Sequence, residues 1–408
     1  MLDIKFIRQN PEKVKEGLAK KQAKVDVGRL LELDEKKRDY LQKIETLRAE
    51  KNKLSKEDII KAQGIKAEIK NLEPELANIE KELSSLMRQL PNLPQEDVPV
   101  GKDEKDNVVL REVGSKPKFD FEPKDYMEIA EKLDIIDVKR ASKVSGTRFG
   151  YLKGKTTLLE LALINLAFEV LSKEGFVPII PPVMIKPEMM EAMGYIDTPE
   201  DRAERYFLKE NNLVLVGTSE QSIGPMRKDD IFEEKKLPKR YVAFSTCFRE
   251  EAGAYGKDTK GIMRVHQFDK VEMFSICQPE KSKEEHQFLL KMEEKLMQSL
   301  KLPYRVVQLC TGDLARPSAS TIDIETWMPG QGEYRETHST SNCTDFQARR
   351  LNIRYRGKQG LEFVHTLNGT AFAIGRMLIA IIENYQQKNG NVKVPKVLQK
   401  YTWFKKID

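Results

Sequence analysis

A charged stretch at residues 241–274, YVAFSTCFREEAGAYGKDTKGIMRVHQFDKVEMF, contains residue types that could bind a phosphorylated ligand. Two β-type runs flank a loop rich in Gly and Lys, a pattern that predicts an antiparallel hairpin with a long tip. Side chains alternate faces along a strand, so residues two apart share a face. Pairing would then gather guanidiniums, carboxylates and an aromatic ring on one surface: Arg249 and Glu251 from the outgoing strand, with Arg264, His266, Phe268, Lys270 and Glu272 from the returning strand.

The chemistry of this surface suits a nucleotide. A guanidinium is planar and donates two hydrogen bonds to a phosphate at once, and Phe268 offers a face on which a base could stack. From Arg264 to Glu272 the shared face extends over about 25 Å, the scale of a nucleotide joined to a second small molecule. A solvated hairpin with one ion pair would explain the charges equally simply, so the interpretation depends on the rest of the chain.

Composition narrows the class of protein. The chain has 408 residues, a length sufficient for two or three domains. Charged residues make up 33% of it and hydrophobic residues 39%. The net charge of +6 permits a polyanionic partner without requiring one. We find no apolar run of the ~20 residues that would span a bilayer and no signal-peptide core, so a cytoplasmic protein is expected. Four dispersed cysteines without a CxxC pattern disfavour zinc and disulfides: Cys247, Cys277, Cys310 and Cys343.

The first third of the chain carries heptad repeats. Apolar residues at 3-4 spacing within residues 28–90 predict two helices that pair as an antiparallel coiled-coil arm, with Gly64 near its tip. Pro74 is expected to kink the second helix or to leave a carbonyl unbonded. Lys and Arg residues cover the outer faces. They could contact nucleic-acid phosphates without reading bases, although a coiled coil used for dimerisation explains them equally well.

A proline-containing polar segment at residues 91–110 separates the arm from the rest of the chain. We therefore predict an N-terminal domain at 1–104 and a second domain at 105–408. In the second domain, a helix with apolar Leu159, Leu163 and Leu166 is expected to end at Gly175 and to lead into a strand that reaches Pro182.

Three further segments carry polar residues at regular spacing. VLVGTSEQ (214–221) predicts a strand that ends with Thr218 and Glu220 on one face. Residues 322–356 predict a strand, a turn and a strand, with Glu336 and Ser339 in the second strand and Glu325 in the first. In residues 365–386, Thr370 is predicted to cap a helix that holds Arg376 near its start.

Taken in order, these elements resemble the seryl-tRNA synthetase family. FRxE, a Gly-rich loop and RVHQFxKVE resemble the second motif of class II aminoacyl-tRNA synthetases. The helix leading to Pro182 and HTLNGTAFAIGRM resemble the first and third motifs. The TxE element, the helical arm, the linker at 91–110 and the tail VPKVLQKY also match. The resemblance implies an α+β protein with an N-terminal antiparallel coiled-coil arm and a class II catalytic domain built on a mostly antiparallel sheet flanked by helices.

The resemblance also implies a reaction and a set of site residues. The reaction is ATP-dependent formation of seryl-adenylate, followed by transfer of the seryl group to tRNA. Serine binding is implied for Thr218, Glu220, Arg249, Glu272, Asn368 and Thr370. ATP binding is implied for Arg249, Glu251, Arg264, Val265, Phe268, Glu336, Ser339 and Arg376. Catalysis is implied for Arg249, Arg264 and Arg376, and Mg²⁺ binding for Glu336 and Ser339. No zinc is expected.

The implied partners are ATP, L-serine, tRNA(Ser) and a second copy of the chain, joined through the first motif. Charging of tRNA(Sec) is left open. Lys257 and Lys260 in loop 252–263 are candidate contacts for the tRNA acceptor stem. The alternatives are a catalytically silent paralogue that binds tRNA, an amino-acid ligase acting on a carrier protein, and a coiled-coil scaffold. The first is disfavoured by the intact residues Arg249, Glu251, Glu336 and Arg376. The second is disfavoured by the arm and by the lack of a zinc-binding pattern, and the third would leave residues 140–400 unexplained.

Overall fold

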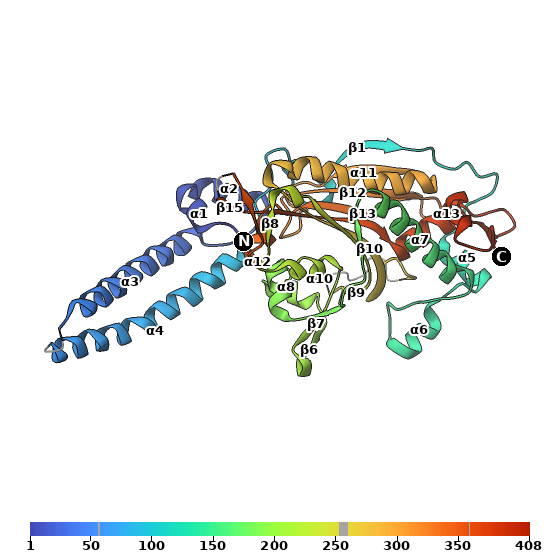
Figure 1. Ribbon diagram of the computed structural model, residues 1–408. Coiled ribbons are helices and arrows are strands. Elements are labelled where there is room, and N and C mark those ends of the chain that lie inside the picture. Colours follow the sequence, from blue (N-terminus) through green and yellow to red (C-terminus); the bar gives the residue numbers. More distant parts are fainter. Residues whose placement is uncertain (56–57, 253–259, 359) are drawn as a thin grey trace. The chain divides into compact units, whose positions relative to one another are not determined.

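The computed structural model describes residues 1–408 except 56–57, 253–259 and 359. The chain divides into two compact units, Met1–Leu93 and Pro94–Asp408 (Figure 1). Within the described residues, no helix combines the length and apolar character needed to cross a membrane.

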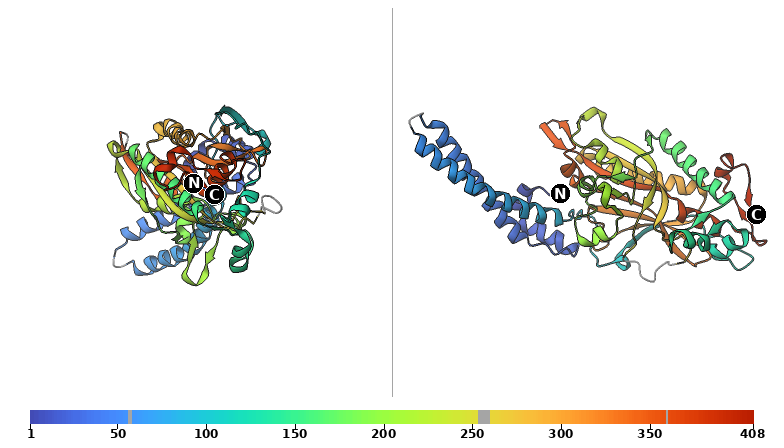
Figure 2. Two further views of the ribbon diagram at one scale, coloured as in Figure 1. Left: turned by 90° about the vertical axis from the view of Figure 1, so that its right-hand side faces the viewer. Right: turned by 90° about the horizontal axis from the view of Figure 1, so that it is seen from below.

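The described residues of the first unit form four helices: α1 (Ile4–Gln9), α2 (Pro11–Lys20), α3 (Val27–Lys53) and α4 (Ile59–Gln89). The long helices α3 and α4 pack side by side as a hairpin (Figure 2). At the base of the hairpin, α1 and α2 pack on it through buried apolar side chains, among them Ile7, Leu30 and Leu90. Asp26 begins α3 by accepting a hydrogen bond from the Arg29 amide.

Charged pairs also join the two helices, beginning at the base of the hairpin. Arg29 contacts Glu82 at 2.9 Å. Lys37, which follows Leu30 by seven residues and so lies in the heptad seam, contacts Glu80 at 2.9 Å. Its long aliphatic stem lets the ammonium reach the edge of the seam. Gly64, predicted to lie near the tip, is within helix α4, which begins at Ile59. α4 also runs through Pro74 without ending.

The second unit is built on an eight-stranded sheet. Its strands are β1 (Val108–Val113), β4 (Val177–Ile179), β9 (Lys239–Phe248), β10 (Gln267–Cys277), β11 (Tyr304–Gln308), β12 (Ser320–Met328), β13 (Glu333–Asn342) and β16 (His365–Ala373). They lie in the order β1-β11-β12-β13-β16-β10-β9-β4. Neighbouring strands are antiparallel except β4 and β9, which are parallel. The predicted mostly antiparallel sheet is confirmed.

The main helices cover one face of this sheet. They are α5 (Tyr126–Leu133), α7 (Lys155–Lys173), α11 (Ser282–Leu300) and α13 (Ile374–Asn384). Alternation along β10 sends Val271 and Met273 into the core beneath these helices, whereas Phe274 and Ile276 join a second apolar cluster. That second cluster includes residues of α8 (Pro187–Met193) and α12 (Phe346–Leu351). One face of the sheet is therefore fully packed, and part of the other stays open.

Smaller elements complete the second unit. The remaining helices are α6 (Val138–Ser145), α9 (Pro199–Ala203) and α10 (Glu220–Ile223). The remaining strands form small sheets: β2 (Ile136–Asp137) with β3 (Tyr151–Leu152); β5 (Met184–Ile185), β6 (Phe207–Leu208) and β7 (Leu213–Leu215); β8 (Ile231–Glu233), β14 (Arg354–Gly357) and β15 (Gly360–Phe363); and β17 (Val392–Lys393) with β18 (Lys406–Ile407).

Candidate active site

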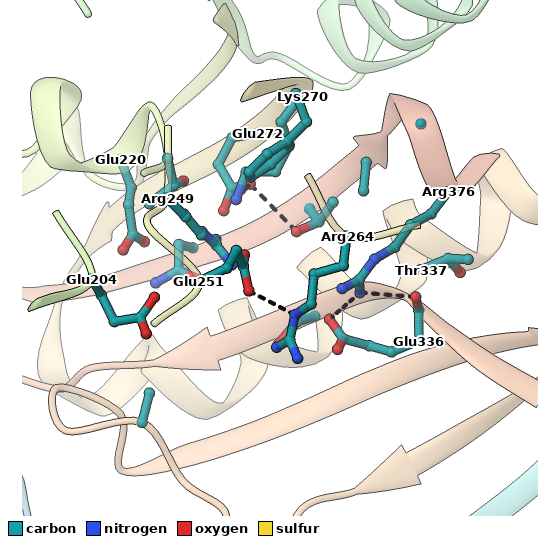
Figure 3. Close-up of a pocket in the computed structure, with 18 of the residues that line it drawn as sticks. Glu204, Glu220, Arg249, Glu251, Arg264, Lys270, Glu272, Glu336, Thr337 and Arg376 are labelled. Atoms are coloured by element: carbon teal, nitrogen blue, oxygen red, sulfur yellow. Dashed lines mark hydrogen bonds and ion pairs between the residues drawn. The ribbon is translucent and has the colours of Figure 1, made fainter. Parts of the chain in front are cut away.

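A pocket of about 630 Å³ opens beside β10, β13 and β16 (Figure 3). Every residue assigned above to serine, ATP or Mg²⁺ lines it: Thr218, Glu220, Arg249, Glu251, Arg264, Val265, Phe268, Glu272, Glu336, Ser339, Asn368, Thr370 and Arg376. These residues come from segments up to 158 positions apart in the chain, from Thr218 to Arg376. The fold therefore brings the predicted set together, while the role of each residue stays a prediction.

Several of these side chains come from backbone segments other than the predicted paired strands. β9 ends at Phe248 and β10 begins at Gln267, so Arg249, Glu251 and Arg264 lie in the connection and not on paired strands. Glu251 has a φ of 52°, a left-handed conformation that ends regular pairing. The Arg249 amide still donates to the His266 carbonyl at 3.0 Å, which holds the two sides of the connection together.

The TxE segment and the third motif also differ locally from expectation. β7 stops at Leu215, and Glu220 begins the short helix α10, so Thr218 and Glu220 are not on a strand. Thr370 does not cap a helix. It lies within β16, and α13 begins after Ala373 without a side-chain cap. In both places, pairing with neighbouring strands or packing overrides the local sequence signal.

At one end of the pocket, two arginines are held by carboxylates. Nε of Arg264 lies 2.6 Å from Oε2 of Glu251, and Nη1 of Arg376 lies 3.1 Å from Oε1 of Glu336. Desolvation by itself would raise the pKa of Glu336, whose side chain is half exposed, but the charge and hydrogen bond of Arg376, helped by Arg249 and Lys270, hold that pKa below its usual range. This end therefore keeps a carboxylate charged among guanidiniums, as an ATP–metal site requires.

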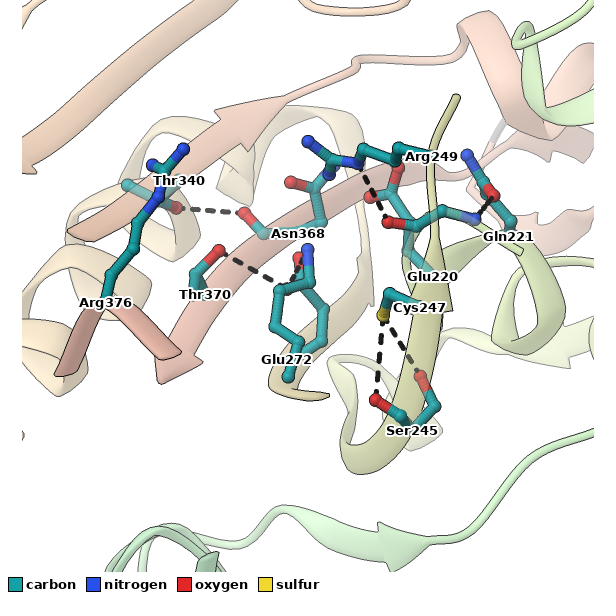
Figure 4. A network of polar contacts seen from close by, with 12 residues as sticks. Glu220, Gln221, Ser245, Cys247, Arg249, Glu272, Thr340, Asn368, Thr370 and Arg376 are labelled. Atoms are coloured by element: carbon teal, nitrogen blue, oxygen red, sulfur yellow. Dashed lines mark hydrogen bonds and ion pairs between the residues drawn. The ribbon is translucent and has the colours of Figure 1, made fainter. Parts of the chain in front are cut away.

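At the other end lie two buried carboxylates, Glu220 and Glu272, which Figure 4 shows with their polar contacts. Nζ of Lys270 lies 2.8 Å from Oε2 of Glu272, and the Thr370 hydroxyl donates to that oxygen at 3.4 Å. Glu220 is 2% exposed and accepts a hydrogen bond from the Tyr195 hydroxyl. Burial, then the nearby charge of Glu272, raises the pKa of Glu220 to about 7. This end is suited to a small ligand that carries a positive charge and a hydroxyl.

Several buried polar atoms of pocket-lining residues at this end have no partner within the described part of the chain. They include Oε2 of Glu220, Oγ1 of Thr218, Nε2 of Gln221 and Nε of Arg205. Buried polar groups are nearly always hydrogen-bonded in folded proteins, because leaving one unpaired costs free energy. Orphaned atoms that line a pocket are therefore natural positions for ligand contacts.

Arg249 lies between the two ends (Figure 3). Its Nε donates to the Gly217 carbonyl at 3.2 Å, and its guanidinium lies 5.2 Å from the centre of the Phe268 ring. The Gly217 amide in turn donates to Oε1 of Gln221 at 2.7 Å. These contacts hold the Arg249 guanidinium in position relative to Glu220. The guanidinium forms no ion pair with a carboxylate among the described residues.

The sequence also suggested residues that the structure places elsewhere. Glu325 contacts Arg305 and does not line the pocket. His338, between Glu336 and Ser339 on β13, is buried, and burial lowers its pKa to about 3. His266 lies outside the pocket and contacts the Arg249 carbonyl and the Tyr206 hydroxyl, both at 3.0 Å. Lys257 falls among the residues that the structure does not describe.

Sequence reasoning gave no role to several residues that line the pocket: Tyr195, Glu204, Arg205, Gln221, Lys270, Thr337 and Ser341. Lys270 had a usable signal, since it shares a strand face with Phe268 and Glu272. Tyr195, Glu204 and Arg205 had none, because they precede the TxE element in a segment without a chemical motif.

An antiparallel sheet with a nucleotide-sized pocket, lined by residues of the second and third motifs, defines a class II aminoacyl-tRNA synthetase. Residues 205–385 match the model of the class II tRNA synthetase core domain (G, H, P, S and T), and residues 1–94 match the seryl-tRNA synthetase N-terminal domain. The serine–tRNA ligase of Dictyoglomus thermophilum is 46% identical, with 100% of this chain and 99% of the relative covered. The chain belongs to the seryl-tRNA synthetase family.

Solved structures agree with this assignment. The seryl-tRNA synthetase of Pyrococcus horikoshii, complexed with ATP, superposes with a TM-score of 0.93 at 42% identity. The match covers 100% of this chain and 99% of that one. The cytoplasmic serine–tRNA ligase of Naegleria fowleri, in complex with AMP, gives a TM-score of 0.90 at 36% identity over the same shares of each chain. The family and fold expected from the sequence are confirmed.

Proposed function

We propose that this chain is a serine–tRNA ligase, which activates L-serine with ATP to seryl-adenylate and transfers the seryl group to the 3′ end of tRNA(Ser). The observation that carries the proposal is that one pocket holds buried carboxylates at one end and paired arginines at the other, joined by Arg249. Family membership supports the same reaction.

Serine occupies the acidic end of the pocket. Glu220 and Glu272 face its ammonium and hydroxyl, together with Thr218, Asn368 and Thr370. The unpartnered Oε2 of Glu220 and hydroxyl of Thr218 gain partners when serine binds. Alanine is rejected because it lacks the hydroxyl and would leave a buried polar group unpaired.

ATP occupies the arginine end. Glu251 accepts from the adenine amino group beside Val265, and the ring stacks between Phe268 and Arg376. Arg264 and Arg376 neutralise the outer phosphates, so their present contacts with Glu251 and Glu336 rearrange when ATP binds. Arginine suits this exchange because one guanidinium can bind either a carboxylate or a phosphate with paired hydrogen bonds.

Glu336 and Ser339 fit Mg²⁺. Both line the pocket at the arginine end, both offer oxygen, and the carboxyl of Glu336 stays ionised because of the neighbouring arginines. Hard oxygen donors with room for water and phosphate oxygens are the usual magnesium environment. Bound with ATP, the ion would supply charge neutralisation on the phosphate oxygens.

The reaction needs no covalent intermediate with the enzyme. The serine carboxylate, oriented by Arg249, attacks the α-phosphorus of ATP, and pyrophosphate leaves. The terminal ribose hydroxyl of tRNA then attacks the seryl carbonyl, and AMP leaves. Catalysis consists of positioning the reactants and stabilising charge, the two contributions that a preformed, charged pocket provides.

The larger partners follow from the same family. Residues 1–104, with the α3–α4 arm, bind tRNA(Ser) through its phosphates, and residues 105–408 carry the catalytic site. The exposed Lys260 is a candidate contact for the acceptor stem. The chain acts in the cytoplasm as a homodimer, and tRNA(Sec) is a second candidate substrate.

The proposal is tested by aminoacylation. Purified protein, ATP, Mg²⁺ and radiolabelled serine are expected to charge tRNA(Ser), and labelled alanine and threonine are expected not to. The same assay with tRNA(Sec) decides whether the protein also charges that tRNA. Absence of seryl-tRNA with tRNA(Ser) would contradict the proposed function.

A further inference from the structure

Arg205 lies in the pocket but belongs to none of the three class motifs. It follows α9 and precedes β6, and its guanidinium lies 5.4 Å from the centre of the Tyr195 ring. Tyr195 in turn donates its hydroxyl hydrogen bond to Glu220. Arg205 is therefore linked to the acidic end of the pocket, where serine is proposed to bind.

Arg205 and Arg249 both contact Gly217. Nε of Arg249 donates to the Gly217 carbonyl at 3.2 Å, while a Cβ at Gly217 would come within 3.1 Å of Nη1 of Arg205. Glycine thus makes room for a second guanidinium next to the first. Two cations held side by side repel each other, and the charge of Arg249, after burial, lowers the pKa of Arg205.

The only side-chain hydrogen bond found for Arg205 within the described residues runs from Nη1 to the Glu204 carbonyl at 3.2 Å. Its Nε is buried and has no partner there, and it forms no ion pair with a described carboxylate. Asp201, a nearby acid, contacts Arg316 at 3.1 Å instead. A partly buried guanidinium with an unused donor, beside a second guanidinium, would be stabilised by a bound anion, because the anion pairs the charge and accepts the hydrogen bond.

We propose that Arg205 joins Arg249 in binding the carboxylate of the amino-acid substrate, so that two guanidiniums hold the group that attacks ATP. The acids of this end, Glu220 and Glu272, take the ammonium and hydroxyl, which leaves the carboxylate as the anionic part of serine. This inference rests on the proposed function, because it assigns a further binding residue to the same substrate.

The test compares Arg205→Gln with the wild type in ATP–pyrophosphate exchange without tRNA. Losing a charge-assisted hydrogen bond is expected to raise KM for serine by about tenfold or more. L-Serinamide keeps the ammonium and hydroxyl but lacks the carboxylate charge. Between wild type and Arg205→Gln, the inhibition constant of serinamide in competition with serine is expected to change by less than about threefold. KM for ATP is expected to change equally little. Arg205→Lys, which keeps the charge, is expected to restore part of the affinity for serine.

Arg202→Gln is the matched control, because Arg202 is exposed on α9, rests on the Phe207 ring at 4.7 Å and does not line the pocket. An unchanged KM for serine in Arg205→Gln would overturn the inference. Equal weakening of serine binding and serinamide binding would also overturn the inference, because it indicates a structural role for Arg205. A rise in KM for ATP alone would overturn it as well, because it indicates a phosphate contact. A wild-type protein without serine-dependent exchange would instead overturn the proposed function.

Discussion

The ammonium of Lys270 lies 2.8 Å from the carboxylate of Glu272, two residues away on β10, and both side chains are buried in the pocket wall. Sharing a strand face places them together, and the contact offsets the cost of burying either charge. The acidic end of the pocket therefore depends on a cation that the motif comparison does not assign to any substrate.

Removing that cation is expected to destabilise the free protein. Lys270→Met leaves Glu272 buried without its partner, which typically costs about 3–5 kcal/mol in the free energy of unfolding. Adding Glu272→Gln removes the stranded charge, so the double variant is expected to regain most of the stability without regaining serine activation. Urea denaturation and pyrophosphate exchange measure the two effects. A double variant as unstable as the single one would contradict this account.

Glu220 predicts a pH dependence for serine binding. Its pKa of about 7 in the free protein lies above the ordinary 4.5, so the carboxyl is largely protonated below pH 7. Binding the serine ammonium favours the ionised form, so kcat/KM for serine is expected to rise as pH increases through about 7. The same shift makes ionised Glu220 unfavourable to the fold, so this group's contribution to stability is lost as pH rises between 4.5 and about 7.

The control for this pH dependence is Glu220→Gln, which cannot ionise. The variant is expected to bind serine weakly and to lose the rise in kcat/KM near pH 7. A wild-type profile that is flat from pH 6 to pH 8, or an identical rise in the variant, would show that Glu220 does not control it.

The arm can be tested apart from the pocket. The cluster at its base includes Leu33 and Leu83, so replacing residues 40–78 with a short Gly-Ser link keeps that cluster intact. Serine-dependent pyrophosphate exchange is expected to continue, while transfer to tRNA(Ser) is lost because the phosphate-binding helices are gone. Unchanged transfer to tRNA would remove the arm from the proposed function.

The proposed homodimer predicts a mass. Light scattering at micromolar concentration is expected to give twice the chain's 47.0 kDa. Ile180, which follows β4 in the first motif, is 82% exposed in the single chain. It is therefore a suitable position at which to test the proposed dimer interface. Ile180→Asp is expected to shift the protein toward monomer. A mass of one chain for the wild type would refute the homodimer.

About half of the residues that line the pocket could be predicted from the sequence, because the motifs carry both residue type and order. Local structure was less predictable. The TxE segment follows a short apolar run that favours a strand, yet Glu220 starts a helix. Thr370 precedes a helical pattern but pairs within β16. Arg205 and Tyr195 could not be found at all, since only the folded chain brings their segment to Gly217 and Glu220.

The most direct measurement of the central claim is ATP–pyrophosphate exchange with each of the twenty amino acids, without tRNA, for the wild type and Arg249→Ala. Arg249 joins the serine and ATP ends of the pocket, so the account predicts exchange with serine alone and its loss in the variant. Exchange with a different amino acid, or serine-dependent exchange that persists without Arg249, would contradict the account.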